Sequence, residues 1–222
     1  MTDTERVAPR REFMKTVGMS AAAIAVSAVS LRAGAEEIDR ISADEAWLNR
    51  LTGKHRQFFD AVSANDGWGL VFASTYMTKN MEAYGLKPAE ITTVVGLRHM
   101  AMPLALNDAM WSKYKVGQLI NVMDKSTKAP ATRNVYANVR PGDVFMDGAS
   151  VDSIMSRGGI VTACNVALTV LAGMAAGAAG LPADGAAAEW RANLLPGVVV
   201  VPAGVLAVNR AQEHSCTYCY AG

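Results

Sequence analysis

Short apolar stretches alternate with helical patterns along this chain, and this alternation constrains the fold more than any other feature. Turn residues bound the apolar stretches, which are too short for buried helices, so strands are predicted at 70–73, 91–97, 160–163, 198–201 and 217–220. Helical patterns lie between them at 76–84, 103–116, 166–179 and 205–214. Such alternation produces a parallel sheet with helices on both faces. The sequence therefore predicts an α/β fold, a three-layer α/β/α domain with a mostly parallel five-stranded sheet.

One cysteine lies where the predicted strand 160–163 meets the following helix. Cys164 comes directly after this apolar run, and ligands collect at the carboxyl ends of the strands in open parallel sheets. The positive partial charge at a helix N-terminus favours the reactive thiolate form of a cysteine. A free cysteine also occurs as a small buried apolar residue. Position alone therefore leaves a reactive thiol and a packing residue as alternatives.

Other polar residues are expected near the same edge of the sheet. His99 follows the predicted strand 91–97 and Asn165 follows Cys164, so both are predicted to line a pocket at the thiol. The segment 120–150 is long for a loop in a compact domain, which indicates a functional or mobile connection. Within it, Arg133 would suit a small anion, and a solvated loop arginine is the alternative.

The N-terminus has the pattern of an export signal. Arg10 and Arg11 precede Glu12-Phe13-Met14-Lys15, an apolar run at 17–31 and an Ala-x-Ala cleavage site that ends at Ala35. This order predicts a twin-arginine signal peptide at 1–35, recognised by the twin-arginine export machinery, and a mature protein in the bacterial periplasm. The apolar run is too short for a permanent membrane span. An uncleaved anchor is the alternative.

Charge and local pattern describe the chain beyond this signal. The 222 residues have a formal net charge of +1, and without residues 1–35 the net charge becomes −1. This balance argues against nucleic acid as a partner. Residues 42–45 have a helix-capping pattern, with Trp47, Leu48 and Leu51 on one face of the helix. A helical lead-in is therefore predicted at 36–64, before a single domain at 65–222.

Two runs in the second half of the chain carry a family resemblance. They are Gly-Ile-Val-Thr-Ala-Cys-Asn-Val-Ala-Leu at 159–168 and Leu-Pro-Gly-Val-Val-Val-Val-Pro-Ala-Gly-Val at 195–205, followed by Asn-Arg-Ala-Gln-Glu at 209–213. This pattern resembles the DsrE/DsrF-like family, including the small YchN-like proteins, over roughly residues 65–222. The resemblance implies a three-layer domain assembled as a homotrimer or homohexamer. In sulfur-handling members, a cysteine at the end of the third strand carries a persulfide between partners, and Cys164 occupies that place.

The chain departs from this family pattern in three ways. Sulfur-relay members are cytoplasmic, whereas this chain has an export signal, and its 120–150 loop is longer than expected. The tail also adds Cys216 and Cys219 in a C-x-x-C spacing close to His214. This pair is interpreted as a structural disulfide or unused thiols, as a redox pair that exchanges with Cys164, or as a soft metal site that includes a histidine. Residues three apart on a strand point to opposite faces, which weakens the last two interpretations.

These residues and the resemblance together predict a function. The first hypothesis is an exported DsrE-like protein that carries sulfur as a persulfide, or exchanges thiols, through Cys164 with a sulfur-transfer partner. The second is a non-catalytic periplasmic binding or assembly protein whose cysteines are structural. The third is a metal-binding protein that uses Cys216 and Cys219. No cofactor is predicted.

Overall fold

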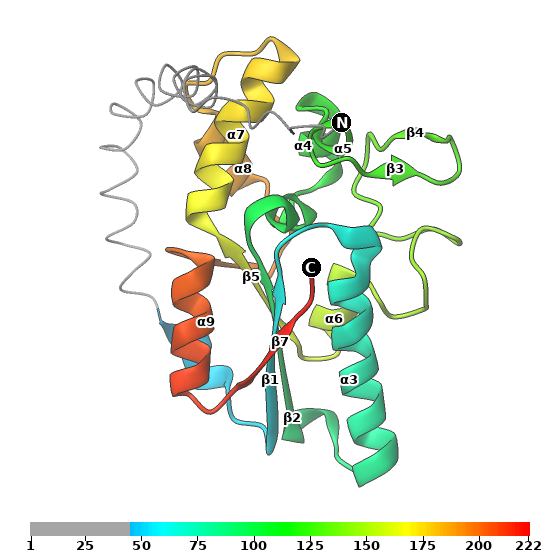
Figure 1. Cartoon of the computed structure of the whole chain (residues 1–222), viewed down its shortest axis with the longest axis vertical. Coiled ribbons are helices and arrows are strands. Elements are labelled where there is room, and N and C mark those ends of the chain that lie inside the picture. Colours follow the sequence, from blue (N-terminus) through cyan, green and yellow to red (C-terminus); the bar gives the residue numbers. More distant parts are fainter. Residues whose placement is uncertain (1–44) are drawn as a thin grey trace, which may run out of the picture. The chain divides into compact units, whose positions relative to one another are not determined.

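The computed structural model describes residues 45–222, and a sheet of five parallel strands forms its centre (Figure 1). The strands are β1 (His55–Ala61), β2 (Ile91–Leu97), β5 (Ile160–Cys164), β6 (Val199–Val201) and β7 (Thr217–Tyr220). They pair in the order β6-β5-β2-β1-β7, and each neighbouring pair is parallel. The carboxyl ends of all these strands therefore lie along one edge of the sheet.

Helices cover both faces of the sheet, which confirms the predicted three-layer α/β/α domain (Figure 1). One face packs against α9 (Gly204–Glu213) and the 3-10 helix η2 (Ala46–Arg50). The other face packs against α3 (Trp68–Tyr84) and α6 (Val151–Ser156). α7 (Asn165–Ala179) follows β5 directly and packs against α8 (Ala186–Ala192). The face under α9 is called the α9 face below.

Short elements complete the chain between the main helices and strands. They are the 3-10 helices η3 (Asn65–Gly67), η4 (Pro88–Glu90) and η5 (His99–Ala105), the helices α4 (Asp108–Lys113) and α5 (Val116–Leu119), and the paired strands β3 (Met123–Asp124) and β4 (Ala129–Pro130). η5 begins two residues after β2, so it lies at the carboxyl edge of the sheet.

Alternate side chains of each strand point to opposite faces, which gives the sheet two apolar clusters. The cluster on the α9 face contains Trp47, Leu48, Leu51, Phe58, Val94, Ile160, Val201, Ala207, Ala211 and Cys216. The cluster on the other face is larger and includes Phe59, Val95, Leu97, Val161 and Ala163. β2 is buried along its whole length. The middle of the sheet therefore excludes water, and solvent-accessible polar side chains lie at its edges and in the loops.

The first predicted strand was placed wrongly. Residues 70–73 belong to α3, which begins at Trp68 after Gly67 adopts a left-handed φ of 80°. Leu70, Val71, Ser74 and Met77 are buried at helical spacing on this element. The apolar run at 70–73 thus marks the buried side of a helix, because a short run alone does not distinguish the two structures.

The predicted helical lead-in at 36–64 was also wrong over its second half. Residues 55–61 form β1, and this strand lies between β2 and β7 rather than outside the sheet. Phe58 and Phe59 pack on opposite faces, which a strand allows and a single helix face does not. The domain therefore starts before the predicted boundary at residue 65, because η2 and β1 supply part of its core.

The long connection at 120–150 contains the β3–β4 hairpin and is otherwise irregular. The predicted signal peptide at 1–35, with Arg10 and Arg11 and cleavage after Ala35, lies outside the described residues. Within residues 45–222, no helix combines the length and the apolar character that crossing a membrane requires.

Candidate functional site

Polar side chains from several strands meet on the α9 face near the carboxyl edge. Asp60 is the penultimate residue of β1, and Arg98 extends β2 by one residue in extended conformation. Because Leu97 pairs with Ala163, the next residues along the two strands, Arg98 and Cys164, lie side by side. The alternation of side chains places Asp60, Arg98, Cys164 and Tyr218 on the same face of the sheet.

Asp60 and Arg98 form a two-bond ion pair across β1 and β2. Nε and Nη2 of Arg98 donate to Oδ1 and Oδ2 of Asp60 at 2.7 and 2.8 Å. The side chain of Asp60 is 3% exposed and that of Arg98 is 26% exposed. A buried carboxylate requires such a partner, because removal from water penalises an unpaired charge. The pair therefore fixes the guanidinium at the edge of the sheet.

Tyr218 adds a third group to this pair. Its hydroxyl donates to Oδ2 of Asp60 at 2.8 Å. Burial, and then the hydrogen bond to Asp60, raises the pKa of Tyr218. Hydrogen bonds to Asp60 raise the pKa of Arg98 against the opposing effect of burial, and Tyr218 and Cys164 contribute smaller attractions. The guanidinium is thus charged, and it is directed toward Asp60 on β1.

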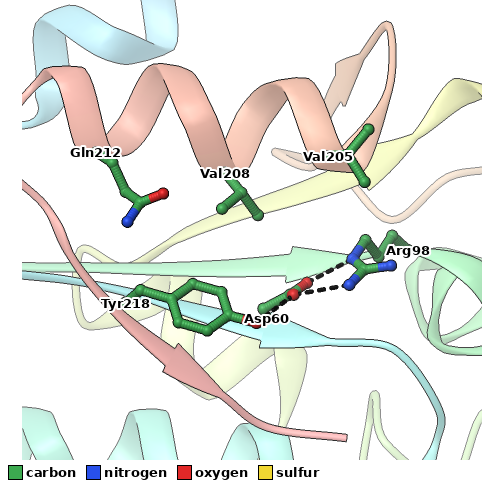
Figure 2. Close-up of a pocket in the computed structure, with 6 residues that line it drawn as sticks. All are labelled: Asp60, Arg98, Val205, Val208, Gln212 and Tyr218. Carbon is green, nitrogen blue, oxygen red and sulfur yellow. Dashed lines mark hydrogen bonds and ion pairs between the residues drawn. The ribbon is translucent and has the colours of Figure 1, made fainter.

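A hollow of about 310 Å³ opens beside this group of residues (Figure 2). Figure 2 shows Val205, Val208 and Gln212 pointing from α9 toward the sheet, with Arg98, Asp60 and Tyr218 on the opposite side. A methyl group added at Gly204 would approach Cβ of Arg98 to 2.6 Å. The glycine therefore allows α9 to begin directly over the Arg98 side chain.

Cys164 lies at the junction that the sequence predicted. It is the last residue of β5 and the N-cap of α7, and its Sγ accepts a hydrogen bond from the backbone N–H of Ala167 at 3.4 Å. The residue is 6% exposed. The sulfur therefore receives one of the donors that a helix leaves unpaired at its start, but only a small part of it contacts solvent.

His99 and Asn165 have different surroundings from those predicted. His99 is exposed, with a left-handed φ of 48°, at the start of η5 on the carboxyl edge. Asn165 is buried, and its Oδ1 accepts a hydrogen bond from Nε of Arg191 at 2.8 Å. Arg191 belongs to α8, so the amide of Asn165 holds α8 against α7. Neither residue lines the hollow beside Arg98.

Arg133 is engaged by carboxylates of its own loop. Its Nη1 and Nη2 donate to the two oxygens of Asp143 at 2.8 and 2.5 Å, and its Nε lies 3.3 Å from Oδ2 of Asp124. The Arg133 side chain is 11% exposed. The predicted solvated or anion-binding arginine is thus a structural residue that joins distant parts of the 120–150 loop.

The cysteines of the tail do not form a pair. Cys216 is buried in the cluster on the α9 face, whereas Cys219 packs against the cluster on the other face. All three cysteines have free thiols. His214 ends α9, and its Nδ1 lies 2.8 Å from the carbonyl oxygen of Arg210. Within residues 45–222, no three His, Cys, Asp or Glu side chains are grouped closely enough to hold a metal ion.

A second hollow, of about 370 Å³, lies among the loops at the carboxyl ends of β1 and β2. Asn65, Asp66 and Asn121 line it, and each has a positive φ between 38° and 54°. Asparagine and aspartate adopt this backbone conformation more readily than other residues with a side chain. These turns shape the opening of the hollow, and Tyr136 forms part of its wall.

Sequence reasoning missed Asp60, Arg98 and Tyr218. A signal was present, because Asp60 interrupts the apolar run Phe58-Phe59-Asp60-Ala61, and Arg98 directly follows the apolar strand β2. Opposite charges at the ends of two buried strands need partners. Identifying them as one pair required the knowledge that β1 and β2 are neighbours.

The fold and this edge define an α/β protein with a half-buried guanidinium, its carboxylate partner and a thiol along the carboxyl edge of a parallel sheet. Comparisons with protein-family models, with curated proteins and with solved structures find no match for the chain.

Proposed function

We propose that this chain is an exported thiol protein that carries sulfur on Cys164. The observation that supports this most is the setting of its Sγ. The sulfur receives the Ala167 N–H at the start of α7, and the pairing of β5 with β2 brings Cys164 to the edge of the sheet where Arg98 follows β2. A helix start at the carboxyl edge of a parallel sheet is a place where ligands and chemistry collect. Cys216 and Cys219 do not lie at the start of a helix. Burial raises the pKa of each of these thiols.

The chemistry of such a carrier needs no external oxidant or reductant. The thiolate of Cys164 attacks the outer sulfur of a donor persulfide, the donor S–S bond breaks, and the donor leaves as a thiolate. Cys164 then holds the outer sulfur as a persulfide. An acceptor thiolate attacks this sulfur in turn and regenerates the Cys164 thiolate.

The remaining parts of the proposal concern location and assembly. The twin-arginine pattern at 1–35 supports export to the periplasm as a folded domain, and the family resemblance supports a homotrimer or homohexamer. Val166, Val170 and Met174 are exposed at helical spacing along α7. An apolar stripe of this kind is typical of surfaces that contact another chain, which supports self-association.

A non-catalytic binding protein is the second candidate. It is favoured by the hollow beside Arg98, which Cys164 does not line, and by the small exposed fraction of Cys164. In this case the thiol is a packing residue, and the hollow is the functional part of the edge.

Mass spectrometry of the intact protein distinguishes the two candidates. The chain is purified without reductant, treated with a low-molecular-weight persulfide, and mapped by peptides that contain Cys164, Cys216 and Cys219. A sulfur carrier gains mass in steps of one sulfur atom on Cys164, and a thiol acceptor then removes it. Cys164→Ser abolishes the gain, while Cys216→Ser, the matched buried-cysteine control, retains it. A Cys164 that takes up no sulfur and resists alkylation contradicts the carrier function and leaves the binding protein.

A further inference from the structure

The hollow beside Arg98 has one charged wall whose hydrogen-bonding capacity is only partly used. Asp60 occupies Nε and Nη2 of the guanidinium, and Figure 2 shows the third nitrogen pointing away from that carboxylate. Among the hydrogen bonds within residues 45–222, none uses Nη1 of Arg98. A guanidinium offers donors in two parallel directions, and such an edge matches the two oxygens of a carboxylate.

The hollow is otherwise apolar except at Gln212 of α9. Val205 and Val208 are on α9, and the ring of Tyr218 lies on the sheet side (Figure 2). Val205 is 66% exposed and Tyr218 is 43% exposed, although the surrounding sheet is well packed. A volume of about 310 Å³ is at the lower end of the range for small-molecule pockets. The space suits an organic ligand with a short apolar body.

The charged residues that line the hollow are balanced, one carboxylate against one guanidinium, so an anion meets no net negative charge. Arg98 neutralises the carboxylate of Asp60, and Tyr218 also donates to it, so both oxygens of Asp60 are already hydrogen-bonded. The first turn of α9, which has no capping side chain, supplies Val205 to the same space, and the start of a helix carries positive partial charge.

We propose that this hollow binds a small organic carboxylate. The two oxygens of the ligand carboxylate accept hydrogen bonds from the edge of the Arg98 guanidinium formed by Nη1 and Nη2. The apolar body of the ligand lies between Val205, Val208 and the Tyr218 ring. Asp60 positions the guanidinium and does not touch the ligand. No step of this binding involves Cys164, so the inference is independent of the proposed sulfur carriage.

Titration of the full chain with four probes tests the ligand class. Hexanoate is the test ligand, hexanamide has the same shape without charge, acetate has the charge without the apolar body, and sulfate is an inorganic anion. Isothermal calorimetry, together with amide chemical shifts of Val205 and Tyr218, measures binding and its location. Hexanoate is expected to bind at least about tenfold more tightly than each of the others. Equal binding of hexanamide, or of sulfate, overturns the proposal.

Variants of the two walls test the position of the ligand. Val205→Glu places a negative charge at an exposed helix position and is expected to weaken hexanoate binding about tenfold or more without lowering the thermal midpoint. Val205→Lys, the matched control, is expected to retain or strengthen binding. Arg98→Lys keeps the positive charge beside Asp60 but lacks the two-nitrogen edge, so binding is expected to fall.

Two further variants show whether a change in binding comes from the hollow, from a general effect on the fold or from the Cys164 thiol. Arg157→Lys changes an arginine that bonds to Ser74 and Thr78, far along the chain from α9 and on the α3 side of the sheet, and should leave binding unchanged. Cys164→Ser should also bind hexanoate like the unmodified chain. Equal affinity of Val205→Glu and Val205→Lys contradicts the proposed site, whatever the outcome of the sulfur-transfer experiment.

Discussion

Cys216 and Cys219 lie on opposite faces of the central sheet, although only two residues separate them. Cys216 packs under α9, and Cys219 packs against the cluster on the α3 side. The odd spacing along an extended strand produces this arrangement. A disulfide requires Cβ atoms that approach and point toward each other, so the native tail cannot close a Cys216–Cys219 bond without losing the β7 pairing to β1.

We therefore predict three separate thiols with distinct reactivity. Under native conditions at pH 8, Cys219 should be alkylated fastest because it is only partly buried, while Cys216 should react slowest. Burial raises the pKa of both tail thiols, so the difference in their exposure, and not in their ionisation, sets this order. Quenched alkylation followed by peptide mapping measures the order, with unfolded protein in urea as the control. A Cys216–Cys219 crosslink in folded, unreduced protein would contradict the described tail.

The Asp60–Arg98 pair should show strong coupling in a double-mutant cycle. Arg98→Met leaves the buried carboxylate with only Tyr218 as a partner, so it should lower the free energy of unfolding by about 2 kcal/mol. Asp60→Asn should have a similar effect. The double variant should lose clearly less than the sum of the two single losses, because neither charge is then left alone. Urea unfolding at pH 7 measures all four proteins, and additive losses would show that the pair is not coupled.

Two glycine-to-alanine changes should act in opposite directions. A methyl group at Gly96 would lie 2.3 Å from Cζ of Phe58, inside the cluster on the α9 face. Gly96→Ala should therefore lower the free energy of unfolding by about 1–3 kcal/mol. Gly173 lies within α7 with open space at its Cβ position, so Gly173→Ala should raise it by about 0.5–1 kcal/mol. Thermal or urea unfolding of both variants checks the contrast.

The 120–150 loop should weaken in acid. Burial alone would raise the pKa of Asp143, but the hydrogen bonds from Arg133, the backbone hydrogen bond from Arg140 and the charge of Arg133 together outweigh it and lower this pKa. Hydrogen bonds from Ser126, with a smaller contribution from Arg133, lower the pKa of Asp124. A lowered carboxylate pKa stabilises the fold above the unfolded value of about 4, and this stabilisation is lost as the pH falls through the folded-state value.

Arg133→Met measures this contribution. At pH 6 the variant should be about 2 kcal/mol less stable than the unmodified chain, because two carboxylates lose their half-buried partner. The difference should shrink as the pH falls toward 3 and both carboxylates become protonated. Arg210→Met is the control, since Arg210 pairs with Glu45 and Glu213 at the surface, and its effect should be far smaller. A pH-independent difference would exclude the carboxylates as its source.

Much of the fold could be predicted, because its periodicity is local. The strands 91–97 and 217–220 match β2 and β7, and the junction at Cys164 follows from an apolar run that meets a long Ala/Gly-rich helix. β1 was missed because Phe58-Phe59 suits either a strand or a helix until its neighbours are known. The residues 70–73 were assigned to a strand for the same reason.

The candidate site could be predicted only where it depends on chain order. The predicted chain order is enough to place Cys164 at the carboxyl edge of the sheet. The pairing of Asp60 with Arg98 depends on β1 and β2 being neighbours, and no local sequence pattern indicates this. For Arg133 the sequence leaves an anion-binding residue and a solvated loop arginine as alternatives, because its partners Asp124 and Asp143 are brought to it only by the folding of the loop. Ion pairs and hydrogen bonds between residues that are distant in the sequence are the part of the site that could not be predicted from the sequence.

The parallel pairing of β1 with β7 has a consequence for how the chain is made. Thr217 donates its hydroxyl hydrogen to the carbonyl of Arg56, a partner 161 positions earlier. While the protein is being synthesised, β1 can find β2 early, but its other side stays unpaired until residues 217–220 have been added. Contacts between such distant segments form slowly. The same late strand brings Tyr218 to Asp60, so this wall of the hollow is completed only after residue 218 has been synthesised.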